Sequence, residues 1–334
     1  MSPDEPADGA AARAGRLSAA RFDYAEFDLS DVRTFPLESR PGKTRTDQLA
    51  RPFVRGSGVT GLLESLPALL AAADFREVVR RLGDARRSGS GILWGFGAHV
   101  IKTGLGPVLI DLMERGYVSA LATNGAGVIH DFEIALAGAT SEDVEEQLGP
   151  GRFGMADETG RLLNGAIVDG VSRGEGLGEA VGAYLRGVAP RYEQLSMVAA
   201  ASRLSIPLTV HVALGTDVIH MHPAASGAAL GEASLRDFRR FVGNVARLEG
   251  GVYLNCGSAV ILPEVFLKAV ALVRNRGISL EGLTTVNLDF VRLYRPETNV
   301  VRRPPAGVGT GYSLIGHHEL LIPLLAAALV EQGD

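Results

Sequence analysis

The sequence predicts an α/β protein, a Rossmann-like parallel sheet with helices on both faces. Two stretches support this prediction, residues 97–105 (GAHVIKTGL) and 122–131 (ATNGAGVIHD), which lie about one helix length apart. Each follows an apolar strand pattern and leads through a glycine-bearing turn into a helix pattern. Further strand and helix patterns alternate to about residue 290. Such alternation is typical of βαβ units in a parallel sheet.

The individual elements follow from hydrophobic periodicity and from turn residues. Helices are expected over residues 62–82, 107–115, 235–247 and 264–274, and strands over residues 91–96, 118–123, 208–213, 252–255 and 284–290. Residues 140–143 (TSED) predict a helix N-terminus, because a hydroxyl followed three residues later by an acid can satisfy free N–H groups. Residues 1–20, rich in Ala, Asp and Gly, are expected to form a disordered tail before a single domain over residues 21–334.

Composition restricts the class of partner. The 334-residue chain is 46% hydrophobic, enough for a sizeable core, and its formal net charge of −5 argues against broad binding to nucleic acid or to anionic membranes. The sequence shows no secretory signal pattern and no long apolar span. Its one cysteine, Cys256, excludes an intrachain disulfide and is expected to be buried. These features predict a cytoplasmic protein that acts on a small molecule, without nucleic-acid or membrane partners.

The glycine turn at residues 125–127 is the first candidate site. Gly125 and Gly127 can take positive φ and let backbone N–H groups approach a ligand, and the positive end of the next helix points at the same place, which favours an anion such as pyrophosphate. The pattern is an incomplete dinucleotide fingerprint, since His130 stands where a third glycine would be. A tight structural turn is the alternative interpretation.

These stretches carry a family resemblance. The order from Ala98 to Leu105, a helix through residues 111–116, a strand over 117–123 and the loop 124–131 resembles the NAD-binding region of deoxyhypusine synthase. The similarity continues from about Val59 to the C-terminus, through residues 160–164 (GRLLN), 206–209 (IPLT), 216–222 (TDVIHMH), 250–254 (GGVYL) and 322–325 (IPLL).

The resemblance implies NAD as cofactor and a homotetramer with sites at subunit interfaces. It implies that the cofactor is bound by His99, Lys102, Thr103, Gly104, Thr123, Asn124, Gly125, Ala126, Gly127, Asp131, Thr216, Gly316 and His317. Lys102 replaces a serine that contacts the cofactor in the family. It could neutralise a phosphate, act as nucleophile or base, or be a solvated surface residue.

A second cluster follows the strand expected at residues 208–213. Histidine exchanges protons near neutral pH, so one at a strand end could take a proton while a cofactor takes hydride. By resemblance, Asp217 and His222 match the Asp and His of the family's Gly-Asp-Met-x-x-Phe-His motif, and that His belongs to the substrate pocket. The predicted catalytic residues are His222, Asp217, His130 and Lys102.

The chain departs from the family where the family does its chemistry. Deoxyhypusine synthase carries a late lysine that forms a covalent imine, whereas the lysines here are Lys43, Lys102 and Lys268. Two acids of the family's glycine loop are replaced by Ile129 and His130, and an aspartate of its nicotinamide site by His317 or its neighbour. Authentic deoxyhypusine synthesis is therefore not expected.

Three hypotheses follow. The first is an NAD-dependent enzyme that removes hydride next to nitrogen in an amine-bearing or small polar substrate, through an imine. The second is a metal-dependent hydrolase, because His220 and His222 lie two apart on an extended chain and could share a cation with further histidines. The third is an NAD-binding protein without catalysis.

Overall fold

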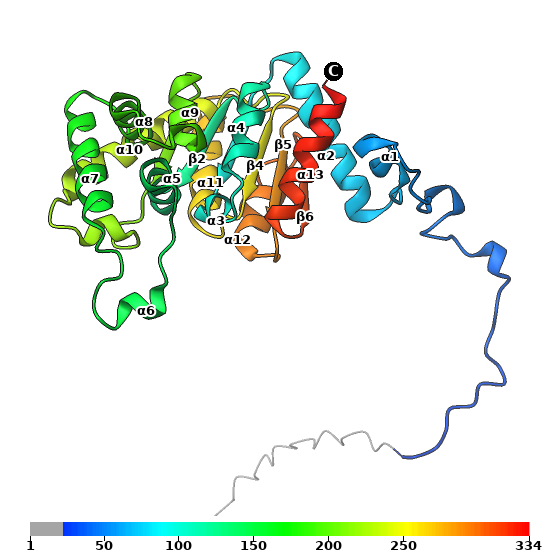
Figure 1. The fold of residues 1–334 in the computed structure, drawn as a ribbon. Helices are drawn as coiled ribbons and strands as arrows, with labels where there is room; N and C mark the ends of the chain where they lie inside the picture. Colours follow the sequence, from blue (N-terminus) through cyan, green and yellow to red (C-terminus); the bar gives the residue numbers. More distant parts are fainter. Residues whose placement is uncertain (1–22, 334) are drawn as a thin grey trace, which may run out of the picture. The chain divides into compact units, whose positions relative to one another are not determined.

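The computed structural model describes residues 23–333 (Figure 1). The chain divides into two units, residues 1–43 and residues 44–334. In the first unit, residues 23–43 are exposed and contain one short 3₁₀ turn, η1 (Leu37–Ser39). The tail expected over residues 1–20 lies outside the described residues.

A six-stranded parallel sheet organises the second unit. Its strands are β1 (Ile92–Phe96), β2 (Ala120–Asn124), β3 (Leu208–His211), β4 (Val252–Cys256), β5 (Thr284–Asp289) and β6 (Thr310–Ile315). They lie in the order β3-β2-β1-β4-β5-β6, and every neighbouring pair is parallel. This order places a topological switch point between β1 and β4, where open α/β sheets bind ligands beyond the carboxyl ends of the strands. The predicted fold class is confirmed.

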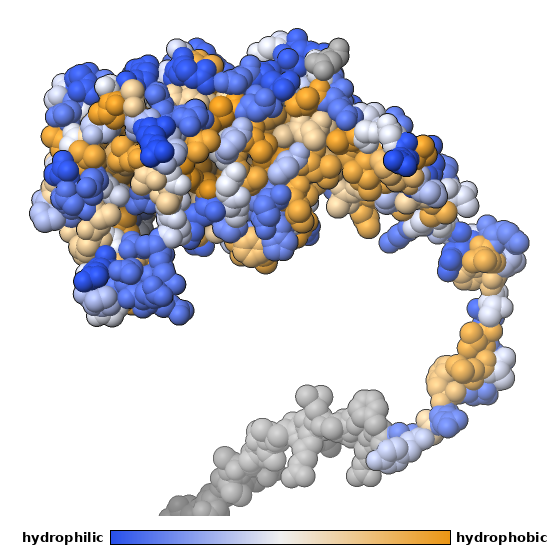
Figure 2. All heavy atoms as spheres, in the orientation of Figure 1, coloured by the Kyte–Doolittle hydropathy of each residue, from blue (hydrophilic) through white to orange (hydrophobic). Residues whose placement is uncertain are grey.

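Side chains alternate between two cores, one on each face of the sheet. Ile92, Trp94 and Phe96 of β1 belong to the larger core, and Leu93, between Ile92 and Trp94, belongs to the smaller one. The helices that contribute to the larger core include α2 (Leu70–Ser88), α4 (Gly106–Glu114), α5 (Gly125–Ala137) and α13 (His318–Gln332). The smaller core is covered by α11 (Ile261–Asn275) and the second half of α10 (Gly227–Val245). Apolar residues also gather on the outer surface near α4 and α13 (Figure 2).

The remaining helices extend the sheet or connect its strands. Between α6 and β3 the chain forms three helices, α7 (Asp157–Ser172), α8 (Leu177–Val188) and α9 (Met197–Arg203), and α9 contributes to the larger core (Figure 1). The shorter elements are α1 (Gly58–Ser65), α3 (Ala98–Lys102), α6 (Val144–Leu148), α12 (Tyr294–Pro296), the 3₁₀ turns η2 (Thr46–Gln48), η3 (Glu193–Leu195) and η4 (Val218–Met221), and the π-turn η5 (Glu297–Arg302). In residues 23–333, none of the helices combines the length and hydrophobicity that crossing a bilayer requires.

Three predicted elements need correction. The single helix expected over residues 62–82 is two helices, α1 and α2, because Pro67 lies in the break between them. The helix expected at residue 235 begins at Gly227, where Ser226 caps it by accepting the N–H of Ala229. Residues 140–143 do not cap a helix through Thr140. Asp143 caps α6 by accepting the N–H of Glu146 at 3.1 Å.

The exposed edge of the sheet at β3 is covered by side chains of α10. Asp237 Oδ2 accepts the N–H of Val210 in β3 at 2.9 Å and that of Gly178 in α8 at 3.0 Å. Ser234 Oγ accepts the N–H of Val212 at 3.0 Å. An unpaired strand edge would leave these groups open to another chain. Two side chains of α10 therefore close the edge and hold α8, β3 and α10 together.

Replacing Asp237 tests this arrangement. Asp237→Ala should destabilise the fold by about 2–4 kcal/mol, because two buried N–H groups lose their acceptor. Asp237→Asn keeps an acceptor oxygen and should cost under about 1 kcal/mol near neutral pH. Equal destabilisation by both substitutions in urea unfolding would contradict the proposed role of the carboxylate oxygen.

The same pair of variants has a pH signature. Burial raises the pKa of Asp237 to about 6 from its ordinary value of 3.8, although the two N–H groups lower it in part. A raised carboxyl pKa favours the protonated group in the folded state, so its contribution is complete below about pH 4 and is lost as pH rises through about 6. Unfolding measured across that range should show this loss in the native chain and not in Asp237→Asn.

Candidate functional site

The turns that follow β1 and β4 touch each other at the switch point. A Cβ added at Gly97 would lie 2.6 Å from the carbonyl oxygen of Gly257. The N–H of Gly97 also donates to the carbonyl of Cys256 at 2.9 Å. The side chain of Cys256 is buried, as predicted. The contact between the two turns is thus made by backbone, which leaves the space beyond the strand ends to other side chains.

His318, the first residue of α13, packs into that space. Gly257 has φ of +66°, and a Cβ there would lie 2.7 Å from Cε1 of His318. The imidazole is 1% exposed, and its Nε2 lies 3.0 Å from the carbonyl oxygen of Leu288. Because a carbonyl only accepts, Nε2 carries the hydrogen and Nδ1 presents a lone pair. Nδ1 is buried and has no hydrogen-bond partner within residues 23–333.

Aromatic rings surround His318. His99 lies 5.5 Å from His318 and 6.2 Å from Phe290, measured between ring centroids. His317 stacks on Phe290 with parallel planes and is 67% exposed at its side chain. The resemblance implies that His317 binds the cofactor at this end of the sheet. In the structure His318 is the buried residue of the two, and His317 is exposed. His317 is the N-cap of α13 and has extended backbone, whereas His318 is the first helical residue, so the two side chains leave the chain in different directions.

Asp217 occupies the N-terminal end of α5. A Cβ added at Gly125 would lie 2.0 Å from Asp217 Oδ2, and a Cβ at Gly127 would lie 2.2 Å from the hydroxyl oxygen of Thr123. Neither glycine uses the positive φ that is open to it. These glycines are required by close neighbours instead. Asn124 Oδ1 accepts the N–H of Gly127 at 2.9 Å. The helix end expected to face a phosphate is therefore filled by the protein's own oxygen atoms.

Asp217 and His220 form a buried pair beside this helix end. His220 Nδ1 accepts the N–H groups of Gly215 at 3.1 Å and Asp217 at 3.2 Å, so its Nε2 carries the hydrogen. That Nε2 lies 3.8 Å from Asp217 Oδ2, and both atoms are buried without a hydrogen-bond partner. Burial raises the pKa of Asp217, and His220 together with the N–H of Ala126 lowers it in part. The pair offers one acceptor and one donor to a ligand.

His222 is held on the other side of η4. Its Nδ1 accepts the N–H of Ala224 at 3.1 Å, and its Nε2 lies 3.7 Å from Oδ1 of Asp157, an exposed carboxylate of α7. The two imidazoles of η4 are therefore anchored to different partners. Within the described part of the chain, no group of three or more His, Cys, Asp or Glu residues is arranged to hold a metal ion. The hydrolase hypothesis gains no support from this geometry.

Two predicted site residues are engaged in structural contacts. Asp131 is fully buried and caps α9, where it accepts the Ser196 hydroxyl and the N–H groups of Met197 at 2.7 Å and Val198 at 3.1 Å. Burial raises its pKa to about 6.

His130 Nδ1 lies 2.7 Å from the hydroxyl of Thr140, which donates to Glu133. Glu133 also accepts the hydroxyl of Thr159 in α7 at 3.0 Å. This network ties the segment around α6 to α5 and α7.

The other predicted residues lie at the strand ends as expected from their positions. Thr123 donates its hydroxyl to the carbonyl of Phe96 at 2.9 Å, joining the ends of β1 and β2. Thr103 and Thr216 donate to the carbonyls of His99 and Ala213. Thr216 is exposed, as are Lys102 and Gly104 of the α3 turn. Gly316 follows β6, where its N–H donates to the carbonyl of Asp289 at 2.9 Å.

Sequence reasoning missed a polar face on β4, β5 and β6. Asn255 Nδ2 donates to Asn287 Oδ1 at 2.8 Å, and these two residues pair in register with Ser313. Four buried oxygens near this face have no hydrogen-bond partner in residues 23–333: Asn255 Oδ1, Thr285 Oγ1, Glu297 Oε2 and Ser313 Oγ. The signal was the alternation Thr285, Asn287, Asp289 within a buried strand, which places three polar groups on one face.

Comparisons with known proteins support the fold. No family model and no curated protein matches the chain. Among solved structures, unliganded AgrE aligns with a TM-score of 0.52 at 17% identity, over 78% of this chain and 33% of AgrE. AgrE in a ternary complex with ornithine and NAD+ aligns with a TM-score of 0.50 at 16% identity, with the same coverage. The chain thus spans about a third of the length of AgrE, and the likeness shows a shared α/β fold.

Two further structures align with TM-scores of 0.48. One is a conserved putative LOR/SDH protein from Methanococcus maripaludis S2, at 17% identity over 78% of this chain and 70% of that one. The other is a putative deoxyhypusine synthase from Entamoeba histolytica, at 13% identity over 84% of this chain and 96% of that one.

Gly257 provides a test of the switch-point packing with a matched control. Gly277 also has positive φ, and a Cβ there would meet open space. Gly277→Ala should therefore cost only the backbone strain, about 1 kcal/mol. Gly257→Ala should cost about 1–3 kcal/mol more, because its methyl group displaces the buried imidazole of His318. Urea unfolding measures both, and equal losses would show that Gly257 does not seat His318.

Proposed function

We propose that the chain is an NAD-dependent enzyme of the deoxyhypusine synthase type that acts on a small amine-bearing substrate. The observation that carries the proposal is a set of buried atoms along the carboxyl edge of the sheet that make no hydrogen bond within residues 23–333: His318 Nδ1, and Asp217 Oδ2 with His220 Nε2, which lie 3.8 Å apart. A polar atom buried without a partner is destabilising, and such atoms persist where a ligand completes them. AgrE, which shares the fold, has been solved with ornithine and NAD+.

The residues at this edge fit a dinucleotide, with one revision to the expected placement. In folds of this strand order an acidic side chain accepts hydroxyl groups of the nucleotide ribose. Asp217 Oδ2, an acceptor without a partner beside α5, suits that role. Because the same carboxylate fills the end of α5, we place the phosphates at the turn over residues 97–99 and Lys102. The exposed Lys102 has no ion-pair partner in the described range.

NAD, when bound, supplies an acceptor for the hydride that leaves the carbon next to the substrate nitrogen. The protein must then hold the amine and remove its proton. An imidazole can act as base only through a nitrogen that carries no hydrogen. In His220 and His222 that nitrogen already accepts backbone N–H groups. In His318 it is free, so we assign proton removal to His318 Nδ1 and favour it over His222.

The amine itself is a hydrogen-bond donor and needs acceptors. The polar face of β4 to β6 supplies them in Asn255 Oδ1 and Glu297 Oε2, both buried and without a hydrogen bond in residues 23–333, although Glu297 Oε2 lies 3.7 Å from Arg292 Nε. Asp289, at the end of β5 and next to the residue that holds His318, adds a carboxylate. Since the chain has no lysine after Lys268, the reaction proposed here includes no covalent lysine relay.

The cofactor assignment is tested with Asp217→Asn. An amide cannot accept two ribose hydroxyl groups as a carboxylate does, so NAD should bind about tenfold more weakly. Asp157→Asn, which changes an exposed carboxylate of α7, is the matched control and should leave NAD affinity unchanged. Titration calorimetry with NAD measures both, after any nucleotide released by denaturing the purified chain has been identified. If the native chain fails to bind NAD, the proposed function is wrong.

The base is tested with His318→Gln and His222→Gln. Loss of a general base should lower turnover by roughly two to four orders of magnitude. NADH formation is followed with NAD and a panel of ornithine, arginine and spermidine. His318→Gln should lose turnover while NAD affinity changes little, and His222→Gln should lose far less. The opposite ranking would return the role to His222. A native chain that binds NAD and oxidises no amine would favour the non-catalytic hypothesis.

A further inference from the structure

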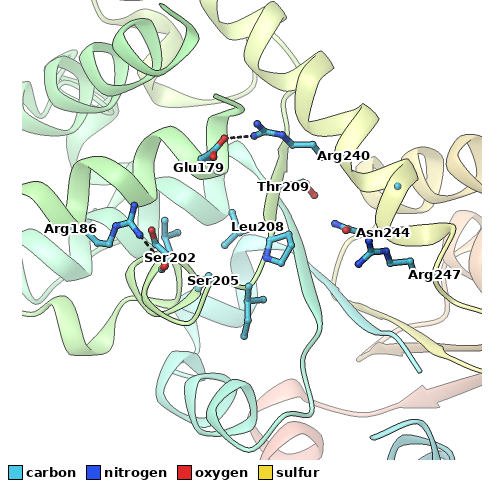
Figure 3. A pocket seen from close by; sticks show the side chains of 15 residues that line it. Glu179, Arg186, Ser202, Ser205, Leu208, Thr209, Arg240, Asn244 and Arg247 are labelled. Carbon is cyan, nitrogen blue, oxygen red and sulfur yellow. Dashed lines mark hydrogen bonds and ion pairs between the residues drawn. The ribbon is translucent and has the colours of Figure 1, made fainter. Parts of the chain in front are cut away.

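A cavity of about 640 Å³ lies at the amino end of β3, the end opposite to the proposed active site (Figure 3). It is bounded by α8, α9 and α10 and by the segment that enters β3. Its floor is apolar and includes Val198, Pro207 and Leu208. None of its lining residues belongs to the site described above, so any ligand here is a separate one.

The cavity has an excess of positive charge. Arg186 of α8, Arg240 of α10 and Arg247, two residues beyond α10, line it (Figure 3). Of its 15 lining residues, Glu179 is the one carboxylate, and it pairs with Arg240 at 2.7 Å. That pairing leaves two of the three guanidinium groups without a carboxylate.

The two remaining arginines have spare donors. Arg186 donates to the carbonyl of Ser202 at 3.2 Å, a neutral acceptor. Arg247 makes no side-chain hydrogen bond or ion pair with any residue of the described range, and it is exposed at the cavity mouth. A guanidinium group presents several N–H donors in a planar fork that matches carboxylate and phosphate oxygens.

A buried donor points to the same kind of ligand. Asn244 Nδ2 is buried at this cavity and has no hydrogen-bond partner within residues 23–333. The hydroxyls of Ser202 and Ser205 also line it. An amide N–H buried without an acceptor is costly, and an oxyanion would satisfy it. Charge, free donors and an apolar floor therefore agree on one chemistry.

We propose that this cavity binds a small organic anion with a multiply charged oxyanion group, a phosphate or a polycarboxylate. The oxyanion lies against Arg186, Arg247 and the amide of Asn244, and its apolar part lies on Pro207 and Leu208. Arg240 lies one turn of α10 before Asn244, and Asp237 lies three residues before Arg240. The side chain of Asp237 binds the backbone of both β3 and α8. A ligand in this cavity therefore contacts β3 and α10, the two elements between which η4 lies in the chain.

The probes are pyrophosphate and citrate, which distinguish phosphate from polycarboxylate, with potassium chloride at matched ionic strength as reference. Titration calorimetry and thermal unfolding of the full chain follow binding. At least one probe should bind, and Arg247→Gln and Arg186→Gln/Arg247→Gln should weaken that probe, the double variant by about tenfold or more. The matched control is Arg239→Gln, an exposed arginine of α10 outside the cavity. It should bind as the native chain does.

Three results would overturn the proposal. The first is stabilisation no greater than that given by chloride, or equal binding by the double variant. The second is weaker NAD binding by Arg247→Gln, which would make the cavity part of the nucleotide site. The third is concentration-dependent self-association that the probes abolish, which would assign the arginines to a second copy of the chain. NAD affinity is measured separately, so the first and third results leave the proposed function untouched, whereas the second would move its nucleotide site.

Discussion

The site depends on how closely the turns after β1 and β4 approach each other. In a parallel sheet whose order reverses between these strands, their turns diverge and leave a crevice. Here the two turns make direct backbone contact through Gly97 and Gly257, and the residual space is taken by the imidazole of His318. A side chain larger than hydrogen at either glycine would push the turns apart or expel the ring. The same constraint fixes α13, since its first residue is held between Gly257 and the carbonyl of Leu288.

Three buried aspartates illustrate how structural and functional carboxylates differ. Asp131 sits at the start of α9, Asp237 at the start of α8 and Asp217 at the start of α5, each where a helix favours negative charge. Both carboxylate oxygens of Asp131 accept hydrogen bonds, three in all. Asp237 Oδ2 accepts one from α8 and one from β3, and Oδ1 faces Arg240. Asp217 leaves Oδ2 buried and unpartnered within the described chain, next to a donor that is equally unpartnered. Asp237 also leaves one oxygen, Oδ1, buried without a hydrogen bond in the described chain, 3.8 Å from a guanidinium nitrogen of Arg240. Asp217 thus differs from Asp131 in having such an oxygen, and from Asp237 in that its neighbour is an imidazole.

The sequence predicted the sheet well and the site less well. Strand patterns such as residues 252–255 and 284–290 are set by burial of alternate or consecutive apolar side chains, a local property that periodicity captures. The sequence analysis did not predict β6, because most of its residues are half-exposed or exposed and several are polar, so no strand pattern of apolar residues marks it. Gly125 and Gly127 were predicted from local turn chemistry. The reason for Gly127 is indeed local, since its close neighbour is Thr123, whereas the reason for Gly125 is tertiary, since Asp217 comes from a segment about 90 residues away. The choice between His317 and His318 likewise depends on how α13 docks, which no pattern around residue 317 specifies.

The chemistry at the carboxyl edge follows from which nitrogen of each imidazole carries hydrogen. His220 and His222 both lie in a short turn whose backbone N–H groups need acceptors, and each Nδ1 supplies one. Each ring therefore presents an N–H outward and serves as a donor. His318 lies at the start of a helix facing the end of β5, where the nearest backbone group is a carbonyl, and this reverses the tautomer. The fold thus places a donor, His220 Nε2, beside Asp217 and a proton acceptor, His318 Nδ1, beside Gly257. That separation suits a reaction in which the nucleotide is held at β2 and β3 and the substrate loses its proton at β4 and β5.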